Sequence, residues 1–301
     1  MDRWTNMMVF ARVARLGSFT QASEELRMST TAVSRRVSEL ETHLGVRLLR
    51  RTTRSLSLTE QGQQYLHRCE MLLDEVEQLE AEVASAKTAA RGILRVTAGT
   101  SFTQEQLAPL LPKFCEQYPD VEIHLSLTDK MLDLIESGID VAIRIGVLQS
   151  SSHKARRFTR CRHVLCASPD YLSRYGTPTT LNELAQHSCV IDTNQSRIWT
   201  FHDGAEVMTF QPQGQLFVNN ADVVKQAVLA GTGIGLLPTF VAGDELDSGA
   251  LVPLLSEYRT YESSIYAVFP AQRHVPAKLR VFLDFLEEHW SPEAPWDSWT
   301  Q

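Results

Sequence analysis

Residues 18–62 read SFTQASEELRMSTTAVSRRVSELETHLGVRLLRRTTRSLSLTEQG, and this stretch decides how the rest of the chain is organised. Its first part predicts a short helix, because Ser18 can accept hydrogen bonds at a helix start and Gln21 completes a capping box. A second capped helix opens at Ser29 or Thr30 and stops at the next glycine. Its apolar residues recur at spacings of 4, 3 and 4, which defines one buried helical face: Val33, Val37, Leu40 and Leu44. Two short helices joined by a tight turn predict a helix-turn-helix.

The opposite face of the second helix carries small hydroxyl groups and one arginine, at Thr30, Thr31, Ser34, Arg35 and Ser38. Beyond the helix, residues 46–58 form two short strand-like runs on either side of a basic, polar tip. Such a hairpin after a helix-turn-helix is typical of a wing. The hydroxyls and arginines suit contact with the bases and phosphates of DNA.

The distribution of charge supports a nucleic-acid partner for this part of the chain. The 301 residues carry a net charge of −7, which by itself argues against binding to nucleic acid. The first 60 residues, however, hold ten basic and six acidic side chains, a charge of +4, so the remainder carries −11. A basic head on an acidic body favours a DNA-reading module joined to a part that avoids DNA.

These residues resemble the winged helix-turn-helix of LysR-type transcriptional regulators. The matching positions are Phe10, Ser18-Phe19-Thr20, Ala22, Leu26, Ala32-Val33-Ser34, Leu40-Glu41, Leu44-Gly45, Leu48, Arg51, Leu58-Thr59 and Gly62. Leu49 stands where the family usually has Phe, and Ser23 where it usually has Ala; both read as packing changes. The resemblance implies that the second helix enters the major groove.

The resemblance also implies which side chains contact DNA. The base-facing positions fall on the helix, and the arginines of the wing suit the minor groove or the backbone. Ser34 and Ser38 are also candidates for phosphate contacts alone. For Arg36, Arg47 and Arg50 the alternative is a solvated or salt-bridged surface, which we favour for Arg36. The complete set expected at DNA is Ser29, Thr30, Thr31, Ser34, Arg35, Ser38, Arg50, Arg51 and Arg54.

Residues 59–89 predict one long helix that links the head to the body. Its apolar residues alternate at spacings of 4 and 3, a heptad seam made of Tyr65, Cys69, Leu72, Val76, Leu79, Val83 and Ala86. Residues 61–90 therefore favour a homodimeric coiled coil, which would offer two heads to a palindromic site. The alternative is that the seam packs on its own chain. The resemblance adds a homotetramer made of two dimers.

From residue 91 the pattern changes to alternating strands and helices. Strands at 93–98, 121–127 and 141–145, with helices at 103–118 and 130–137 between them, predict a parallel sheet. A second α/β unit follows: strands at 163–167, 189–192, 198–201, 206–211, 215–218 and 234–238, and helices at 169–175, 181–184, 221–230 and 238–245. A strand at 263–269 and a helix at 275–290 close the fold, and we expect residues 291–301 to be loosely ordered.

This portion resembles the same family, at residues 167–172, 230–238, 249–252 and 281–286. The resemblance implies a body like that of a periplasmic binding protein, with two α/β lobes and two crossings of the chain, near 161–163 and 262–264. The resulting domains are a winged helix-turn-helix at 1–60, a dimerisation helix at 61–90 and an effector-binding domain at 91–301. Lobe I comprises 91–162 and 264–290, and lobe II comprises 163–263.

The effector site is expected where strands of the two lobes end. A glycine followed by Thr100 and Ser101 brings backbone N–H groups, two hydroxyls and a helix start together, which suits a carboxylate or other anion. The alternative is a plain helix cap without a ligand. The residues expected around the ligand are Thr100, Ser101, Thr128, Gly146, Thr193, Asn194, Phe201 and Asn219.

Other features of the sequence limit the function. Five scattered cysteines without a C-x-x-C pair favour reduced, buried thiols over a disulfide framework or metal site, with Cys161 and Cys166 as a weak alternative redox pair. We expect no cofactor, no membrane span and, from a start without a signal-peptide core, a cytoplasmic protein.

Three functions are compatible with a chain that carries such a head. No catalytic motif or paired acid and base is present, so an enzyme with a DNA-binding head is disfavoured. A non-specific DNA-coating protein would be more basic and would need no ligand-binding body. The favoured function is a transcriptional regulator, not an enzyme, in which a small organic acid closes the cleft and changes the bend of the DNA. RNA polymerase is a further candidate partner.

Overall fold

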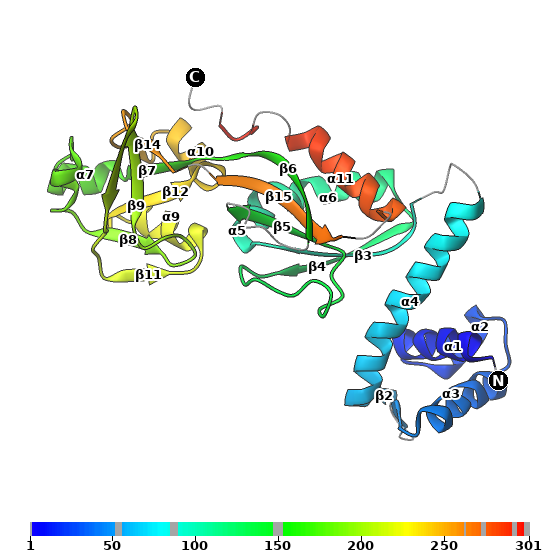
Figure 1. Ribbon diagram of the computed structural model, residues 1–301. Coiled ribbons are helices and arrows are strands. Elements are labelled where there is room, and N and C mark those ends of the chain that lie inside the picture. Colours follow the sequence, from blue (N-terminus) through cyan, green and yellow to red (C-terminus); the bar gives the residue numbers. More distant parts are fainter. Residues whose placement is uncertain are drawn as a thin grey trace. The chain divides into compact units, whose positions relative to one another are not determined.

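The computed structural model describes residues 2–51, 56–84, 90–146, 153–261, 263–271, 275–290 and 294–297 (Figure 1). The chain divides into two compact units, Met1–Ala89 and Ala90–Gln301. Each unit has its own hydrophobic core, so each is described separately.

The N-terminal unit is a winged helix-turn-helix followed by a long helix. Its elements are α1 (Arg3–Leu16), α2 (Phe19–Glu25), α3 (Thr30–Leu44), β1 (Leu49–Arg51), β2 (Leu56–Leu58) and α4 (Glu60–Ala84). The predicted caps are confirmed: Ser18 accepts from the N–H of Gln21 at 3.3 Å, and Ser29 accepts from that of Ala32 at 3.2 Å. Helix α3 ends at Gly45, whose φ of 69° is left-handed and favours glycine.

The core of this unit lies among the first three helices and the wing. Phe10 of α1 and Val33 and Val37 of α3 are completely buried. The ring of Phe10 also packs against Tyr65 of α4, with ring centroids 5.7 Å apart. At Gly62 a Cβ atom would lie 2.0 Å from the carbonyl oxygen of Leu48, so only glycine lets α4 approach the wing this closely.

The predicted heptad seam of α4 is partly used inside the chain. Tyr65 packs on the head, and Cys69 is 1% exposed in the single chain, so this end of the seam is buried without a second helix. Leu72, in contrast, is 50% exposed. The alternative of packing within one chain therefore holds for the first turns of α4. The side chains of Leu79, Val83 and Ala86 lie outside the described residues.

Lobe I of the C-terminal unit is built on one five-stranded sheet in the order β4-β3-β5-β15-β6. Its strands are β3 (Gly92–Ala98), β4 (Val121–Leu127), β5 (Val141–Gly146), β6 (His153–Cys161) and β15 (Ser263–Pro270). The first three are parallel, as predicted, but β15 runs antiparallel to both β5 and β6. The sheet is therefore mixed. Helix α11 (Ala277–Trp290) supplies core residues such as Phe282 and Leu286.

Two predicted helices of lobe I differ from the structure. The helix expected at 103–118 begins earlier and changes pitch, through α5 (Thr100–Phe102), a π-helical turn (Thr103–Leu107), a 3-10 turn (Ala108–Leu110) and α6 (Leu111–Gln117). Pro109 and Pro112 lack the N–H that regular α-helical bonding needs.

The second prediction, a helix at 130–137, is wrong, because this segment forms turns without a helix. The carboxylate of Asp133 accepts from the N–H groups of Ile135 at 2.9 Å and Glu136 at 3.0 Å, which favours a turn. Leu134 alone anchors the segment, at 4% exposure, whereas Met131 is 86% exposed. A single buried side chain is too little to stabilise so short a helix.

Lobe II holds a second five-stranded sheet and a small antiparallel one. The large sheet has the order β11-β8-β12-β7-β13, and the small one β10-β9-β14. The strands are β7 (His163–Ala167), β8 (Cys189–Asp192), β9 (Trp199–Asp203), β10 (Glu206–Phe210), β11 (Leu216–Val218), β12 (Ile234–Pro238), β13 (Val252–Pro253) and β14 (Arg259–Thr260). The helices are α7 (Pro169–Tyr175), α8 (Leu181–Leu184), α9 (Ala221–Leu229) and α10 (Thr239–Asp247).

The chain passes between the lobes twice. Arg162 alone separates β6 of lobe I from β7 of lobe II, and the return path runs between β14 and β15. The carbonyl of Arg162 accepts from the backbone N–H of Thr239, at 2.9 Å, which ties the first crossing to α10. Figure 1 shows the two sheets joined by these strands.

A short C-terminal segment packs against both lobes, contrary to the expectation for residues 291–301. Residues 294–297 are described, and the indole of Trp296 is 8% exposed. It lies edge-on to Phe102 of lobe I, at 5.9 Å, and to Phe240 of lobe II, at 6.1 Å. The carboxylate of Asp297 is 3.6 Å from Nε of Arg162. The rest of the predicted loose segment lies outside the described residues.

Lys225 of α9 forms a second connection between the lobes. Its ammonium lies 3.1 Å from a carboxylate oxygen of Glu245 in α10 and 3.6 Å from one of Glu105 in lobe I. The side chain of Lys225 is 11% exposed, which strengthens these ion pairs relative to surface ones. Of the helices within the described residues, none is long and apolar enough to cross a membrane.

The cysteines are all free thiols, as predicted, although Cys115 is exposed rather than buried. Burial raises the pKa of Cys161, Cys166 and Cys189 to about 12. Cys161 ends β6 and Cys166 lies in β7, and no disulfide joins them. These thiols therefore behave as core side chains rather than as nucleophiles.

Candidate functional sites

Helix α3 presents the polar face that the sequence predicts. Thr30, Thr31 and Arg35 are exposed. The hydroxyl of Thr30 also lies 3.1 Å from that of Ser23 in α2, so the start of α3 is fixed to the neighbouring helix. The guanidinium of Arg35 is 71% exposed and sits 3.6 Å from the carboxylate of Glu39 one turn away, a surface pair that DNA can replace.

The remaining candidate side chains of α3 differ in their surroundings. Ser29 is the N-cap and is exposed, whereas Ser34 and Ser38 are half-buried. Arg36 donates to the side-chain carbonyl of Asn6 at 3.0 Å, and Asn6 is fully buried. Arg36 thus holds α3 against α1, rather than lying on the solvated or salt-bridged surface favoured for it.

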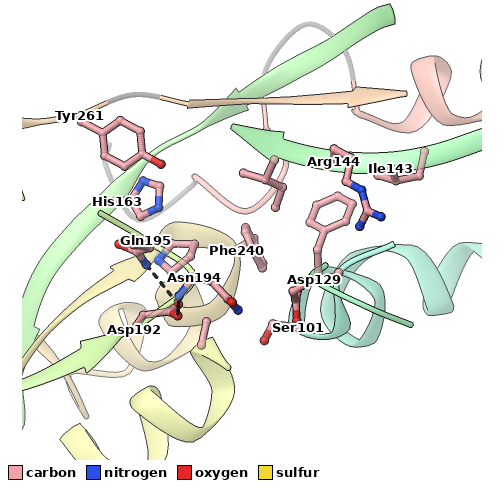
Figure 2. A pocket seen from close by; sticks show the side chains of 15 residues that line it. Ser101, Asp129, Ile143, Arg144, His163, Asp192, Asn194, Gln195, Phe240 and Tyr261 are labelled. Carbon is pink, nitrogen blue, oxygen red and sulfur yellow. Dashed lines mark hydrogen bonds between the residues drawn. The ribbon is translucent and has the colours of Figure 1, made fainter. Parts of the chain in front are cut away.

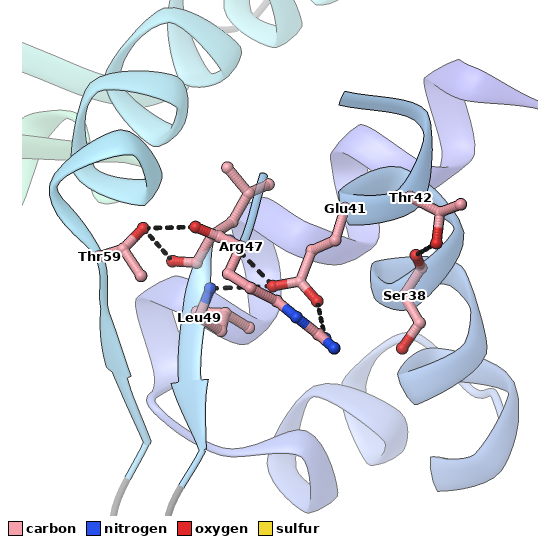
Figure 3. Close-up of polar contacts among 7 residues, drawn as sticks. Ser38, Glu41, Thr42, Arg47, Leu49 and Thr59 are labelled. Carbon is pink, nitrogen blue, oxygen red and sulfur yellow. Dashed lines mark hydrogen bonds and ion pairs between the residues drawn. The ribbon is translucent and has the colours of Figure 1, made fainter. Parts of the chain in front are cut away.

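The wing is fixed to α3 by one buried carboxylate (Figure 3). Glu41, 4% exposed, accepts from the backbone N–H groups of Leu48 at 2.9 Å and Leu49 at 3.1 Å. Its other oxygen accepts from Nη1 of Arg47, at 2.9 Å. Burial opposes ionisation, but the hydrogen bonds from Leu49, Leu48 and Arg47 outweigh it and lower the pKa of Glu41.

A second group closes the base of the wing. Thr59 donates its hydroxyl to the carbonyl of Arg47 at 2.7 Å and accepts from the N–H of Gly62 at 2.9 Å. Arg50 of β1 is exposed. The side chain of Arg51, and all of Arg54 at the predicted tip, lie outside the described residues.

The C-terminal unit contains a cavity of about 170 Å³ between its lobes (Figure 2). Both lobes and both crossings contribute to its walls. The lining residues are Gly99, Ser101, Phe102, Asp129, Ile143, Arg144, Ile145, His163, Asp192, Asn194, Gln195, Ala221, Pro238, Phe240 and Tyr261. The cavity is comparable in size to one that holds a benzene ring, so it suits a small organic ligand.

Of the predicted effector residues, the structure brings Ser101 and Asn194 together at this cavity. Thr100, Thr128, Gly146 and Thr193 are each next to a lining residue in the sequence but do not line the cavity themselves. The carbonyl of Thr128 instead accepts from Nη1 of Arg144, at 2.7 Å.

The two other predicted residues have structural contacts. The carbonyl of Asn219 accepts from the side-chain amide of Asn194, at 2.7 Å, and so positions that lining residue. Phe201 is 1% exposed and belongs to the hydrophobic core of lobe II, so the prediction that it contacts the ligand is wrong. Its alternating strand β9 turns the ring inward.

Sequence reasoning missed most of the charged lining. Asp129 follows β4 and Asp192 ends β8, so the rule that ligands bind beyond strand ends could have found both. Arg144 lies within β5, and Tyr261 lies between strands at a crossing. No local pattern marks these last two, because their place at the cavity depends on how the lobes pack.

Burial controls the electrostatics of this cavity. Burial lowers the pKa of Arg144, and the nearby Asp129 partly opposes this. Burial raises the pKa of Asp192, which still accepts from the N–H of Asn194 at 2.9 Å. The same effect lowers the pKa of His163 to about 4, so its ring is neutral at physiological pH. Among the described residues, no cluster of His, Cys, Asp and Glu could hold a metal ion.

Comparisons with known proteins match both units. Residues 4–63 match the bacterial regulatory helix-turn-helix protein of the lysR family, and residues 87–291 match the LysR substrate binding domain. The transcriptional regulator CrgA of Neisseria meningitidis serogroup C is 37% identical over 285 residues, which is 94% of this chain and 95% of CrgA.

Solved structures agree with this match along the length of the chain. The structure of CrgA, a LysR-type regulator, superposes with a TM-score of 0.63 at 36% identity, covering 96% of this chain and 99% of that one. The full-length virulence activator AphB of Vibrio cholerae gives 0.59 at 31% identity, covering 94% and 97%. This chain therefore belongs to the family of LysR-type transcriptional regulators, with a helix-turn-helix head that binds DNA and an effector-binding body.

Proposed function

We propose that this regulator reads a specific operator through α3 and the wing, and that a small molecule in the interlobe cavity controls this reading. The observation that carries the proposal is the cavity itself, whose polar lining comes from both lobes and both crossings. A ligand that contacts both lobes binds the closed arrangement more tightly and shifts the population toward it.

At the DNA, we assign base contacts to Thr30, Thr31 and Arg35. Arg35 can give two parallel hydrogen bonds to a guanine, and the threonine methyl groups suit thymine. Ser29, Ser34 and Ser38 are assigned to phosphates or bases beside them, and Arg50, Arg51 and Arg54 to the minor groove or the backbone.

The test compares Arg35→Ala with Arg15→Ala, which removes the same charge from the exposed end of α1. An operator is first selected from a random duplex pool, and affinity is measured by fluorescence anisotropy. Arg35→Ala is expected to cost about 1–3 kcal/mol on the operator and to blur the site at one base pair. Equal losses for both variants on operator and random duplex would show that Arg35 contributes charge alone.

For the body, we propose a small organic acid whose carboxylate faces Ser101 and Arg144 on the lobe I wall. Arg144 is the one cationic side chain among the described lining residues. Metabolites are screened for a rise in melting temperature, since a ligand at 100 times its Kd adds about 2.7 kcal/mol of stability. A stabilising acid should also change the affinity for the operator.

We further propose a homodimer through α4 that pairs into a tetramer. The exposed Leu72 supports this, because an apolar side chain 50% exposed in the heptad seam leaves apolar surface that a second helix can cover. Leu72→Glu is expected to raise the dimer dissociation constant at least tenfold in analytical ultracentrifugation, with the change of charge at the half-buried Glu70 (Glu70→Gln) as comparison.

The proposed regulator acts in the cytoplasm, where its DNA and RNA polymerase are found, and catalyses no reaction. Turnover assays on each stabilising metabolite test the second point, and an unaltered metabolite is the expected result. An enzyme with a DNA-binding head would consume it. A DNA-coating protein would show equal affinity for operator and random duplex.

A further inference from the structure

Two carboxylates, one from each lobe, line the interlobe cavity. Asp129 follows β4 in lobe I, and Asp192 ends β8 in lobe II at 8% exposure (Figure 2). The negative charge of Asp129 contributes to the raised pKa of Asp192, after the larger effect of burial. Like charges repel, although Arg144 beside Asp129 offsets part of that negative charge.

The surrounding protein only partly satisfies Asp192. Its oxygens accept from the backbone N–H of Asn194 at 2.9 Å and from Nε2 of Gln195 at 3.4 Å. A carboxylate can accept about four hydrogen bonds, so acceptor capacity remains on the side of the cavity.

A third acceptor lies in the same wall. His163 is 7% exposed, its ring stacks on Tyr261 at 4.9 Å, and its buried Nδ1 atom has no hydrogen-bond partner among the described residues. Burial lowers the pKa of the His163 ring, and a hydrogen bond to the backbone of Tyr261 partly opposes this. A bond that raises the pKa favours the protonated ring, so a ring N–H donates it. Nδ1 is then the lone-pair acceptor of a neutral imidazole. Because His163 lines the cavity, a donor on a ligand is one way to satisfy this acceptor.

Positive charge in the lining is limited. The guanidinium of Arg144 already donates to the carbonyls of Thr128 at 2.7 Å and Lys130 at 3.1 Å. Its remaining N–H groups suit one carboxylate, as proposed above. The lining therefore offers acceptors on two walls and one engaged cation, and a ligand with a carboxylate alone would leave the acceptors unmatched.

We propose that the effector is an amino-substituted organic acid whose ammonium group lies between Asp129 and Asp192, with a hydrogen-bond donor directed at His163. This inference rests on the proposed effector site and specifies the class of ligand. The ammonium carries three N–H donors and a positive charge, so it can bind a carboxylate of each lobe and join them. The rings of Phe102 and Phe240 border the rest of the molecule.

The first test needs no ligand. Asp192→Asn keeps the size of the side chain and one acceptor but removes the charge, so the ligand-free protein is expected to melt at a higher temperature than the wild type. Asp203→Asn, at the exposed end of β9, is the matched control and should leave the melting temperature unchanged. A melting temperature lowered by Asp192→Asn would mean that the carboxylate is already satisfied and would overturn the inference.

The second test uses three sets of probes on the full-length protein at 10 mM: the common L-amino acids, the carboxylic acids that lack only their amino group, and the amines that lack only their carboxylate. At least one amino acid is expected to raise the melting temperature while its two counterparts do not. Asp192→Asn should reduce that rise at least tenfold in apparent affinity, and Asp203→Asn should not change it.

The outcomes separate this inference from the proposed function. If a carboxylic acid without the amino group stabilises the wild type to the same extent as its amino acid, the proposed role of the ammonium group is wrong, and the cavity remains the effector site. Stabilisation by an amino acid that is unchanged in Asp192→Asn, and in a cavity-filling Ser101→Phe variant, would place the ligand elsewhere and overturn both.

Discussion

Replacing Glu41 with alanine is expected to separate the wing from α3 and to destabilise the head. The change removes three hydrogen bonds, from the N–H groups of Leu48 and Leu49 and from Arg47. Arg47 is 76% exposed, so the loss of its bond contributes little. The two backbone groups matter more, because each buried N–H left without an acceptor costs about 1–3 kcal/mol. The expected loss from the two groups is about 2–6 kcal/mol.

Differential scanning calorimetry of the full-length protein measures this loss, since the transition of the head is the one that operator DNA shifts upward. For a unit of this size each 1 kcal/mol lowers the melting temperature by about 4–8 °C, so a drop of at least about 8 °C is expected. Glu41→Gln keeps one acceptor and should lose less than half as much. A drop of under about 2 °C for Glu41→Ala would refute the reasoning.

The lowered pKa of Glu41 adds a prediction about pH. A carboxylate with a lowered pKa in the folded protein stabilises it at pH values above the pKa of the unfolded chain, about 4.3. This stabilisation is lost as the pH falls through the lower folded-state pKa. The difference between the wild type and Glu41→Gln should therefore be constant near neutral pH and shrink below about pH 4.

Three further predictions concern the body. Trp296→Ala should cost about 3–5 kcal/mol, because the indole is buried against both lobes, and should lower the second calorimetric transition without moving that of the head. Lys225→Met should cost about 1–3 kcal/mol in urea unfolding at neutral pH, less than a fully buried pair because the carboxylate of Glu105 is 38% exposed. This cost should shrink at acid pH, since burial already raises the pKa of Glu105. With Ellman's reagent at pH 8 the native protein should show one thiol that reacts fast, Cys115. The fast phase should be absent from the Cys115→Ser variant.

Local signals in the sequence were sufficient to predict the helices of the head and their ends. Ser18, Ser29 and Gly45 act through bonds to residues at most a few positions away, and the structure confirms each cap or end. The spacing of Val33, Val37 and Leu40 likewise describes one helix face and nothing distant. Such short-range determinants can be evaluated without knowledge of the fold.

Several features of the body could not be predicted from local sequence patterns. Strand β6 escaped notice because it is an edge strand, and its charged residues between His153 and Cys161 interrupt any apolar alternation. In the head, the role of Glu41 could not be predicted either, because nothing in a helical pattern marks a carboxylate that accepts hydrogen bonds from the wing. His163 and Tyr261 come together at the cavity only because the chain crosses between lobes twice. Contacts of this kind depend on tertiary packing rather than on neighbouring residues.

The position of Trp296 gives the protein a built-in optical reporter. Its indole packs against Phe102 and Phe240, and both residues also line the cavity. Indole emission depends on the polarity and rigidity of its surroundings, so any rearrangement of that wall should alter the fluorescence of the untagged, unlabelled chain. Occupancy of the body could then be followed in real time, in the same cuvette in which operator DNA is titrated.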